Sequence, residues 1–134
     1  MLAKDIMGRV KAARKTAKGR DIAMRLLSGD YSSLPVVDDE GFVVGIISEF
    51  DILRAIRGGK GIDDVTVDEM MSRNPICVEE DLPVDRLIDI MSEKHLLRVP
   101  VVRDGKLAGS ISRRNILDSI VTPEFKESFW VLRD

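Results

Sequence analysis

The sequence predicts a mixed α/β (α+β) fold made of two copies of one β-α-β-β-α unit. Residues 34–53 read LPVVDDEGFVVGIISEFDIL, and residues 99–117 read VPVVRDGKLAGSISRRNIL. Pro35 recurs as Pro100, 65 residues later. In both copies two apolar runs flank a turn, and stretches with helical spacing lie on either side of them. Because a repeat of this length leaves room for little else in 134 residues, two copies of one unit account for nearly the whole chain.

Size and composition indicate how the copies are stabilised. The chain has 134 residues and a mass of 15.0 kDa. A single copy of roughly 60 residues would bury only a marginal apolar core, so we expect the two copies to share one. Aromatic residues make up 4% of the chain, so the predicted core consists of aliphatic side chains and methionine.

The repeat divides the chain into four segments. We place repeat 1 at residues 1–57, a linker at 58–66, repeat 2 at 67–121 and a C-terminal tail at 122–134. The linker is rich in glycine, which predicts flexibility. The tail holds the only tryptophan and two of the four phenylalanines, so we expect it to dock on the body of the chain or on a partner.

Each copy opens with a short helical turn and then a strand. Residues 3–9 (AKDIMGR) match residues 67–73 (VDEMMSR), and both stretches predict the turn. In copy two, residues 75–78 (PICV) predict a short strand. The matching residues 10–17 (VKAARKTA) are basic and rich in alanine, which predicts a weak or irregular strand in copy one.

A helix and a β-hairpin follow in each copy. Apolar residues at helical spacing predict the helices, and they are Ile22, Ala23, Leu26 and Leu27 in copy one and Val84, Leu87, Ile88 and Met91 in copy two. The predicted strands of the hairpins cover residues 35–37, 42–47, 99–102 and 107–111. Glu40-Gly41 and Asp104-Gly105 lie between them and are typical of hairpin turns.

A second helix closes each copy. Ser48 and Asp51 stand three residues apart at its start in copy one, as do Ser112 and Asn115 in copy two. This spacing resembles a capping box with a short acceptor in place of glutamate. We expect the apolar residues that follow to pack inward, and they are Ile52, Leu53, Ile56, Ile116, Leu117 and Ile120.

Charge and residue counts exclude several functional classes. The formal net charge of the chain is −2, which argues against nucleic acid as a partner. Seven of the first twenty residues are basic, and this segment is either solvated or a contact for phosphate. Cys77 and His95 are single, so we expect no disulfide, no zinc site and no histidine-based triad. No signal peptide or membrane span is apparent, so we expect a cytoplasmic protein without a membrane partner.

Two elements carry a family resemblance. The strand (Leu/Val)-Pro-Val-Val and the element Gly-x-x-Ser-x-x-Asp/Asn, at residues 45–51 and 109–115, both occur twice, in order and at constant offset. Together they resemble the cystathionine β-synthase (CBS) domain family, over residues 3–120. A tandem pair of such domains is called a Bateman module. The resemblance implies two repeats packed about a pseudo-twofold axis through their sheets, two clefts, and a regulatory role without catalysis.

The resemblance implies that a cleft holds an adenosine compound, namely AMP, ADP, ATP or S-adenosylmethionine, with no cofactor required. For a first site it implies Asp51 on the ribose hydroxyls, Ser48 on phosphate at a helix N-terminus, and Ile46, Leu34 and Pro35 beside the adenine. Arginines of the opposite copy would meet the phosphates, and they are Arg98, Arg113 and Arg114.

A second, weaker site would use the matching residues of the other copy. These are Ser112, Asn115, Val99 and Pro100. Asn115 carries no charge, which weakens ribose binding there. For every one of these residues a purely structural role is an alternative: Ser48 as a helix cap, Ile46 as core, and each arginine as a solvated surface residue.

Two functions remain open from the sequence. The first is a regulatory module that binds an adenosine nucleotide and signals to a partner protein, as a homodimer in the manner common in the family. The alternative is a protein–protein interaction or dimerisation module whose ligand sites are empty or vestigial. We expect no enzymatic activity because the sequence offers no nucleophile–base pair and no set of metal ligands.

Overall fold

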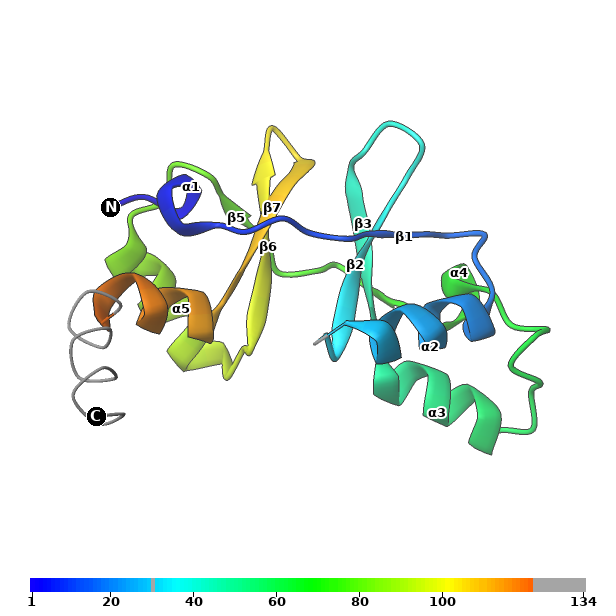
Figure 1. The fold of residues 1–134 in the computed structure, drawn as a ribbon. Helices are drawn as coiled ribbons and strands as arrows, with labels where there is room; N and C mark the ends of the chain where they lie inside the picture. Colours follow the sequence, from blue (N-terminus) through cyan, green and yellow to red (C-terminus); the bar gives the residue numbers. More distant parts are fainter. Residues whose placement is uncertain (30, 122–134) are drawn as a thin grey trace, which may run out of the picture. The chain divides into compact units, whose positions relative to one another are not determined.

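The computed structural model describes residues 1–29 and 31–121 (Figure 1). Helices and short strands alternate along the chain, and the mixed α+β class predicted from the sequence is confirmed. The C-terminal tail, for which docking was predicted, lies outside the described residues.

The chain forms two compact units, and their composition differs from that of the sequence repeats. The first-repeat unit comprises Val10–Ile76 and Asp104–Leu107. The second-repeat unit comprises Met1–Arg9, Cys77–Arg103 and, of the described chain, residues 108–121. Each unit therefore combines the body of one repeat with the leading segment of the other.

The two leading helices are anchored in these exchanged positions by their first residues. Helix α1 (Ala3–Ile6) begins with Ala3, which is fully buried in the core of the second-repeat unit. Helix α4 (Val67–Met70) begins with Val67, fully buried in the core of the first-repeat unit. The backbone N–H of Ala3 donates to the carbonyl of Leu82 at 2.8 Å, and that of Val67 donates to the carbonyl of Ala17 at 2.9 Å. The short helical turns that the sequence predicts are confirmed, each in the unit of the other repeat.

The first-repeat unit contains a four-stranded sheet in the order β1-β2-β3-β4. The strands are β1 (Ala13–Arg14), β2 (Ser33–Val37), β3 (Val43–Ser48) and β4 (Ser72–Arg73). Strand β1 pairs with β2 in parallel, and β2 with β3 and β3 with β4 are antiparallel. Strand β1 has two residues, in agreement with the weak strand that the sequence predicts there.

The second-repeat unit contains a three-stranded sheet in the order β5-β6-β7. The strands are β5 (Val78–Glu79), β6 (Arg98–Arg103) and β7 (Lys106–Ser112). Strand β5 begins only at Val78, whereas the sequence predicts a strand over residues 75–78. Pro75 has no N–H to donate to a neighbouring strand, and Asn74 has a φ of 62°, so the strand does not begin at residue 75.

Three longer helices and one further helical segment complete the fold. They are α2 (Gly19–Ser28), α3 (Glu49–Arg57), α5 (Val84–Lys94) and residues 113–121, which are helical to the end of the described chain. Helices α2 and α3 lie side by side on the first-repeat unit (Figure 1). Helix α5 ends at His95, whose φ of 53° and ψ of 45° form a left-handed C-cap.

The repeated glycines are required by close backbone approach. A Cβ atom on Gly45 would lie 2.7 Å from Met71 Sδ and 2.8 Å from the carbonyl oxygen of Ser72. A Cβ atom on Gly109 would lie 2.7 Å from Met7 Sδ and 3.0 Å from the Gly8 carbonyl oxygen. In each unit, the glycine at this position of the repeat therefore lets the leading segment of the other repeat pack at contact distance.

Apolar residues of the helices do not all pack inward as predicted. Ile22, Leu26, Ile52 and Ile116 are buried. Leu53, Ile56, Leu117 and Ile120 are exposed, so the prediction is wrong for these four residues, and Leu27 of the helical stripe in α2 is exposed as well. A helix of this length buries one stripe against its sheet, and the next apolar position around the helix then faces outward.

Within the residues that the structure describes, no helix is both long and apolar enough to cross a membrane.

Candidate functional site

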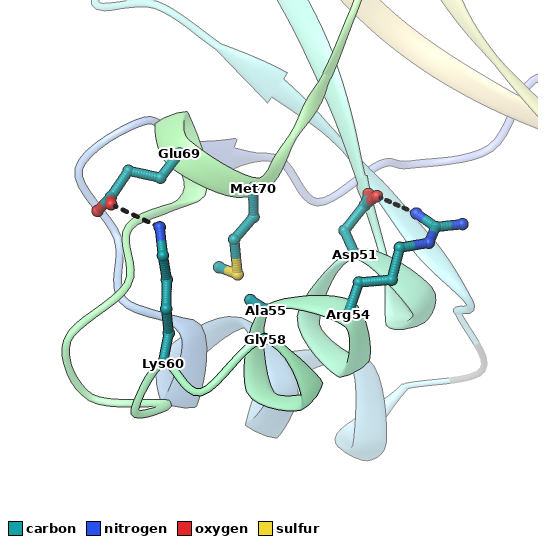
Figure 2. Close-up of a pocket in the computed structure, with 7 residues that line it drawn as sticks. All are labelled: Asp51, Arg54, Ala55, Gly58, Lys60, Glu69 and Met70. Atoms are coloured by element: carbon teal, nitrogen blue, oxygen red, sulfur yellow. Dashed lines mark hydrogen bonds and ion pairs between the residues drawn. The ribbon is translucent and has the colours of Figure 1, made fainter.

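A pocket of about 300 Å³ lies between helices α3 and α4 of the first-repeat unit (Figure 2). Its lining residues are Asp51, Arg54, Ala55, Gly58, Lys60, Glu69 and Met70. The volume is at the lower end of the range for small-molecule sites. Four of the seven lining residues are charged, so a ligand here would be recognised mainly by its polar groups.

Asp51 is held in the pocket wall by a capping box at the start of α3. Ser48 is the N-cap residue, and its Oγ accepts a hydrogen bond from the Asp51 backbone N–H at 3.3 Å. Asp51 Oδ2 in turn accepts from the Ser48 backbone N–H at 2.8 Å and from the Ser48 hydroxyl at 3.0 Å. The box predicted from the sequence is therefore present, and it fixes the orientation of the carboxylate.

The second oxygen of the Asp51 carboxylate faces a cation. Arg54, one helical turn further on, donates from Nη1 to Asp51 Oδ1 at 3.1 Å. The Asp51 side chain is only 7% exposed, whereas that of Arg54 is 72% exposed. The guanidinium also lies over the Phe50 ring, 5.8 Å from its centroid. Arg54 therefore holds the carboxylate from the solvent side.

The opposite wall of the pocket contains a second ion pair. Lys60 Nζ lies 3.6 Å from Glu69 Oε2. The other oxygen of Glu69 accepts from the backbone N–H of Thr66 at 3.1 Å and from its hydroxyl at 3.0 Å. These hydrogen bonds from Thr66, aided by the charge of Lys60, hold the pKa of Glu69 below its usual value. Figure 2 shows this pair on the far side of Met70 from Asp51 and Arg54.

The residues predicted beside an adenine lie on strands β2 and β3 of the same unit. Leu34 is 1% exposed and belongs to the core, so only its backbone could contact a ligand. Pro35 pairs in register with Ile46, which is half-buried and pairs on its other side with Ser72 of β4. Because neighbours along a strand point to opposite faces, Pro35 and Ile46 lie on the sheet face opposite Leu34.

The second-repeat unit contains a matching capping box. The Ser112 backbone N–H donates to Asn115 Oδ1 at 2.8 Å, and the Asn115 backbone N–H donates to Ser112 Oγ at 3.1 Å. Since the atom that accepts from a backbone N–H must be the amide oxygen, the outer atom of Asn115 is Nδ2, a donor. Val99 and Pro100 are buried on β6 of the same unit.

The three arginines predicted as phosphate contacts also belong to the second-repeat unit. Arg98, at the start of β6, donates from Nη1 to Ser110 Oγ at 3.2 Å. Arg113 and Arg114 are the first two residues of the helical segment 113–121, and both are exposed. The backbone N–H of Arg113 donates to the Leu97 carbonyl at 3.1 Å.

The pocket contains residues that sequence reasoning missed. Arg54 could have been found, because residues three apart on a helix are neighbours and Asp51–Arg54 is an acid–base pair at that spacing. Lys60, Glu69 and Met70 could not, because the linker and the leading helix of the other repeat bring them there. Nothing local in their sequence indicates that position.

Apolar grooves lie along the helix pairs of both units. In the first-repeat unit a groove of about 320 Å³ is lined by Ala23, Leu26, Leu27, Glu49, Phe50, Ile52 and Leu53. In the second-repeat unit a groove of about 520 Å³ is lined by Ile88, Met91, Ser92, His95, Leu96, Leu97, Arg113, Ile116, Leu117 and Ile120. These grooves expose aliphatic surface of the kind found at interfaces between subunits.

The side chain of Cys77 is half-buried. The pKa of its thiol is raised, mainly by burial and in addition by the negative charge of Glu79. Across residues 1–29 and 31–121, no three His, Cys, Asp or Glu side chains are grouped as metal ligands would be.

Comparison with known families accounts for the repeat. The family model for the CBS domain matches residues 3–58 and again residues 67–122. An uncharacterised protein of Methanopyrus kandleri is 33% identical over 99 residues, which are 72% of this chain and 50% of the relative. An L-aspartate semialdehyde sulfurtransferase of Methanocaldococcus jannaschii is 34% identical over 117 residues, which are 86% of this chain and 22% of the enzyme. The chain thus spans half or less of the length of these two relatives.

Solved structures share the same fold. The CBS domain pair of protein MJ0100, in complex with 5-methylthioadenosine and S-adenosyl-L-methionine, matches with a TM-score of 0.76 and 33% identity, over 90% of this chain and 99% of that one. CBSX2 in complex with AMP matches with a TM-score of 0.79 over 92% of this chain and 98% of that one. At 22% identity the second match speaks for the fold alone.

Proposed function

The chain belongs to the CBS domain family, with two CBS domains in tandem, and from this premise we propose that it is a non-catalytic regulatory module. It binds an adenosine nucleotide of the AMP, ADP or ATP class and signals to a partner protein. The observation that carries this proposal is the fixed, nearly buried carboxylate of Asp51 in the wall of a polar pocket.

Asp51 suits the hydroxyl groups of a ribose. An ionised carboxylate has two oxygens with about four acceptor positions between them. Two positions on Oδ2 are used by the capping box, whereas Oδ1 accepts from the exposed side chain of Arg54, which a ligand can displace. A hydroxyl pair that donates to a preoriented carboxylate forms charge-assisted hydrogen bonds, which are stronger than bonds between neutral groups.

Ligands of a related domain pair support an adenosine compound. The structure of protein MJ0100, 33% identical to this chain, holds 5-methylthioadenosine and S-adenosyl-L-methionine. Both molecules contain adenine and ribose, which are the parts that Asp51 and the residues Pro35 and Ile46 would meet. We retain Arg98, Arg113 and Arg114 as proposed phosphate contacts contributed by the second repeat.

The occurrence of related segments within larger enzymes supports the proposal of regulation without catalysis. The match to the sulfurtransferase covers 22% of that enzyme, and a match to an inosine-5'-monophosphate dehydrogenase of the same organism covers 16% of it. A segment of this size within larger enzymes is suited to an accessory regulatory role. We also propose a cytoplasmic location, since the single cysteine allows no disulfide within the chain.

A second copy of this chain is the partner that we propose for the helix pairs. Leu27, Phe50 and Leu53 are 82%, 67% and 58% exposed beside the groove of α2 and α3. Because both units carry such a groove, a symmetric dimer could bury like surfaces against one another. Sedimentation equilibrium should give a dimer for the parent chain and a monomer for Leu27→Glu. Lys15→Ala, at an exposed position, changes the net charge by the same −1 and serves as the control. A monomeric parent would contradict the proposal.

Ligand binding is tested by a thermal-shift panel and then by calorimetry. AMP, ADP, ATP, 5-methylthioadenosine and S-adenosylmethionine are compared, because a ligand that binds the folded state raises the melting temperature by mass action. Asp51→Ala should abolish the shift, whereas Asp89→Ala, an exposed aspartate of α5, should leave it intact. An Asp51→Ala variant that binds as tightly as the parent would refute the assignment of this residue.

The second candidate function is an interaction module with vestigial ligand sites. Two observations favour it. Arg54 already donates a hydrogen bond to Asp51 Oδ1, and Asn115 presents a donor where Asp51 presents an acceptor. This function predicts no thermal shift with any adenosine compound, together with an intact dimer.

A further inference from the structure

We propose that Arg54 is a specificity-determining residue that exchanges its bond to Asp51 for a bond to the phosphate group of a bound nucleotide. The ribose hydroxyls take the place of the guanidinium on Asp51 Oδ1, and the released guanidinium contacts the first phosphate. The inference rests on the proposed function and narrows it, because it selects phosphorylated adenosine compounds over those that lack phosphate.

The contacts of Asp51 show that a ligand must compete with Arg54. Oδ2 is fully used by Ser48, whose backbone N–H and hydroxyl lie at 2.8 Å and 3.0 Å. Oδ1 is the oxygen that remains for a ribose, and Arg54 Nη1 lies 3.1 Å from it. A ribose that approaches the carboxylate from the pocket therefore meets a site already neutralised by a cation.

The exposure of the two side chains decides which of them moves. Asp51 is 7% exposed and held by three hydrogen bonds within the capping box. Arg54 is 72% exposed and makes a single-point contact, the kind of surface ion pair that holds its partner weakly. The Phe50 ring, 5.8 Å from the guanidinium carbon, supports the arginine without fixing its hydrogen bonds. Arg54 can therefore swing away while the carboxylate stays in place.

The released guanidinium has a use only if the ligand carries an anion. A guanidinium fork binds phosphate oxygens with two parallel hydrogen bonds, and its charge must otherwise return to water. Lys60 lines the same pocket and is paired with Glu69 at 3.6 Å, so a second cation is within the site for a longer phosphate chain. Both pocket cations are thus paired with carboxylates of the chain, and a phosphate replaces those partners.

Compounds without phosphate gain nothing from this exchange. Adenosine and 5-methylthioadenosine are neutral, so each would break the Asp51–Arg54 pair and leave Arg54 without a new anion. S-adenosylmethionine has a carboxylate at the far end of its methionine part, but its sulfonium cation near the position of the first phosphate repels the guanidinium. The domain pair of MJ0100 holds 5-methylthioadenosine and S-adenosylmethionine, so the exchange would set this chain apart from that relative.

The test compares AMP with adenosine on three proteins by calorimetry: the parent, Arg54→Ala and Arg57→Ala. Arg57 is an exposed arginine on the same helix that does not line the pocket. We expect the parent to bind AMP about 10-fold or more tightly than adenosine, as one charge-assisted contact would give. Arg54→Ala should weaken AMP by about that factor and leave adenosine unchanged or a few-fold tighter. Arg57→Ala should match the parent.

Two results would overturn the inference while the proposed function stands. One is a parent that binds adenosine as tightly as AMP. The other is an Arg54→Ala variant that weakens both ligands equally, which would make Arg54 a structural residue of the pocket. If neither AMP nor adenosine binds the parent and the thermal-shift panel gives no shift with ADP or ATP, the proposed function itself is refuted.

Discussion

The two capping boxes of this chain have the same geometry and different chemistry. Ser48 and Asp51 close one helix start, and Ser112 and Asn115 close the other, with the same first contact of 2.8 Å from backbone N–H to side-chain oxygen. In both boxes the side-chain oxygen that accepts from the backbone N–H of the N-cap serine stabilises the helix start. The outer atom is a carboxylate oxygen in Asp51 and an amide nitrogen in Asn115. The helix start therefore depends on one atom of this side chain, and the ligand binding that we propose depends on the other.

Packing residues, by contrast, are equivalent in the two units. Ile47 and Ile111 are both fully buried, and Gly45 and Gly109 both admit a leading segment at contact distance. We therefore expect matched substitutions to affect stability alike in both repeats and to affect ligand binding in one.

Truncation of the paired core isoleucines should cost the most stability. Ile47→Ala and Ile111→Ala each remove a fully buried side chain, for which the expected loss is about 2–5 kcal/mol in the free energy of unfolding. Urea denaturation of the two variants measures it. A loss at one position that is several-fold smaller than at the other would show that the cores are not equivalent.

Substitution of the paired glycines should have the next largest effect on stability. Gly45→Ala and Gly109→Ala place a Cβ atom 2.7 Å from the sulfur of Met71 or of Met7. Overpacking of this kind costs about 1–3 kcal/mol. We expect a slightly larger loss at Gly45, because its Cβ would also lie 2.8 Å from a backbone oxygen, against 3.0 Å at Gly109. Thermal denaturation of both variants measures it, and two unchanged melting temperatures would contradict the close approach.

The paired caps should have a smaller effect on stability. Ser48→Ala and Ser112→Ala each remove an N-cap acceptor, worth about 1 kcal/mol. Only Ser48→Ala should also weaken AMP, because it frees Asp51 to leave its orientation toward the pocket. Equal ligand affinity in both variants, measured by calorimetry, would show that the capping box does not position the carboxylate.

The smallest expected effect is on the stability of the protein at acid pH. The pKa values of Glu69 and Glu80 are held below their usual range, by hydrogen bonds from Thr66 and from Arg103 respectively. A group with a lowered pKa in the folded state stabilises that state above its ordinary pKa of 4.5, and the contribution is lost as the pH falls. Glu69→Gln and Glu80→Gln should therefore each flatten the fall in melting temperature with acid. An unchanged acid profile in both would contradict these contacts.

Sequence reasoning reached the parts of this structure that depend on local pattern. Strands, helices and both capping boxes follow from periodicity and from residues three apart, such as Ser48 and Asp51. The exchange of leading segments did not follow, because nothing in residues 3–9 or 67–73 shows which repeat they join. The outward position of Leu53 was missed because apolar spacing alone does not tell a core stripe from an exposed one.

The central claim is that the outer atom of one capping side chain decides which repeat binds a nucleotide. Calorimetric titration of AMP into the parent, Asp51→Asn and Asn115→Asp tests it most directly, since both substitutions keep an oxygen for the capping box. We expect one AMP per parent chain, an affinity about 10-fold or more lower in Asp51→Asn, and an added weaker site in Asn115→Asp. Binding to Asp51→Asn with the affinity and stoichiometry of the parent would contradict the claim.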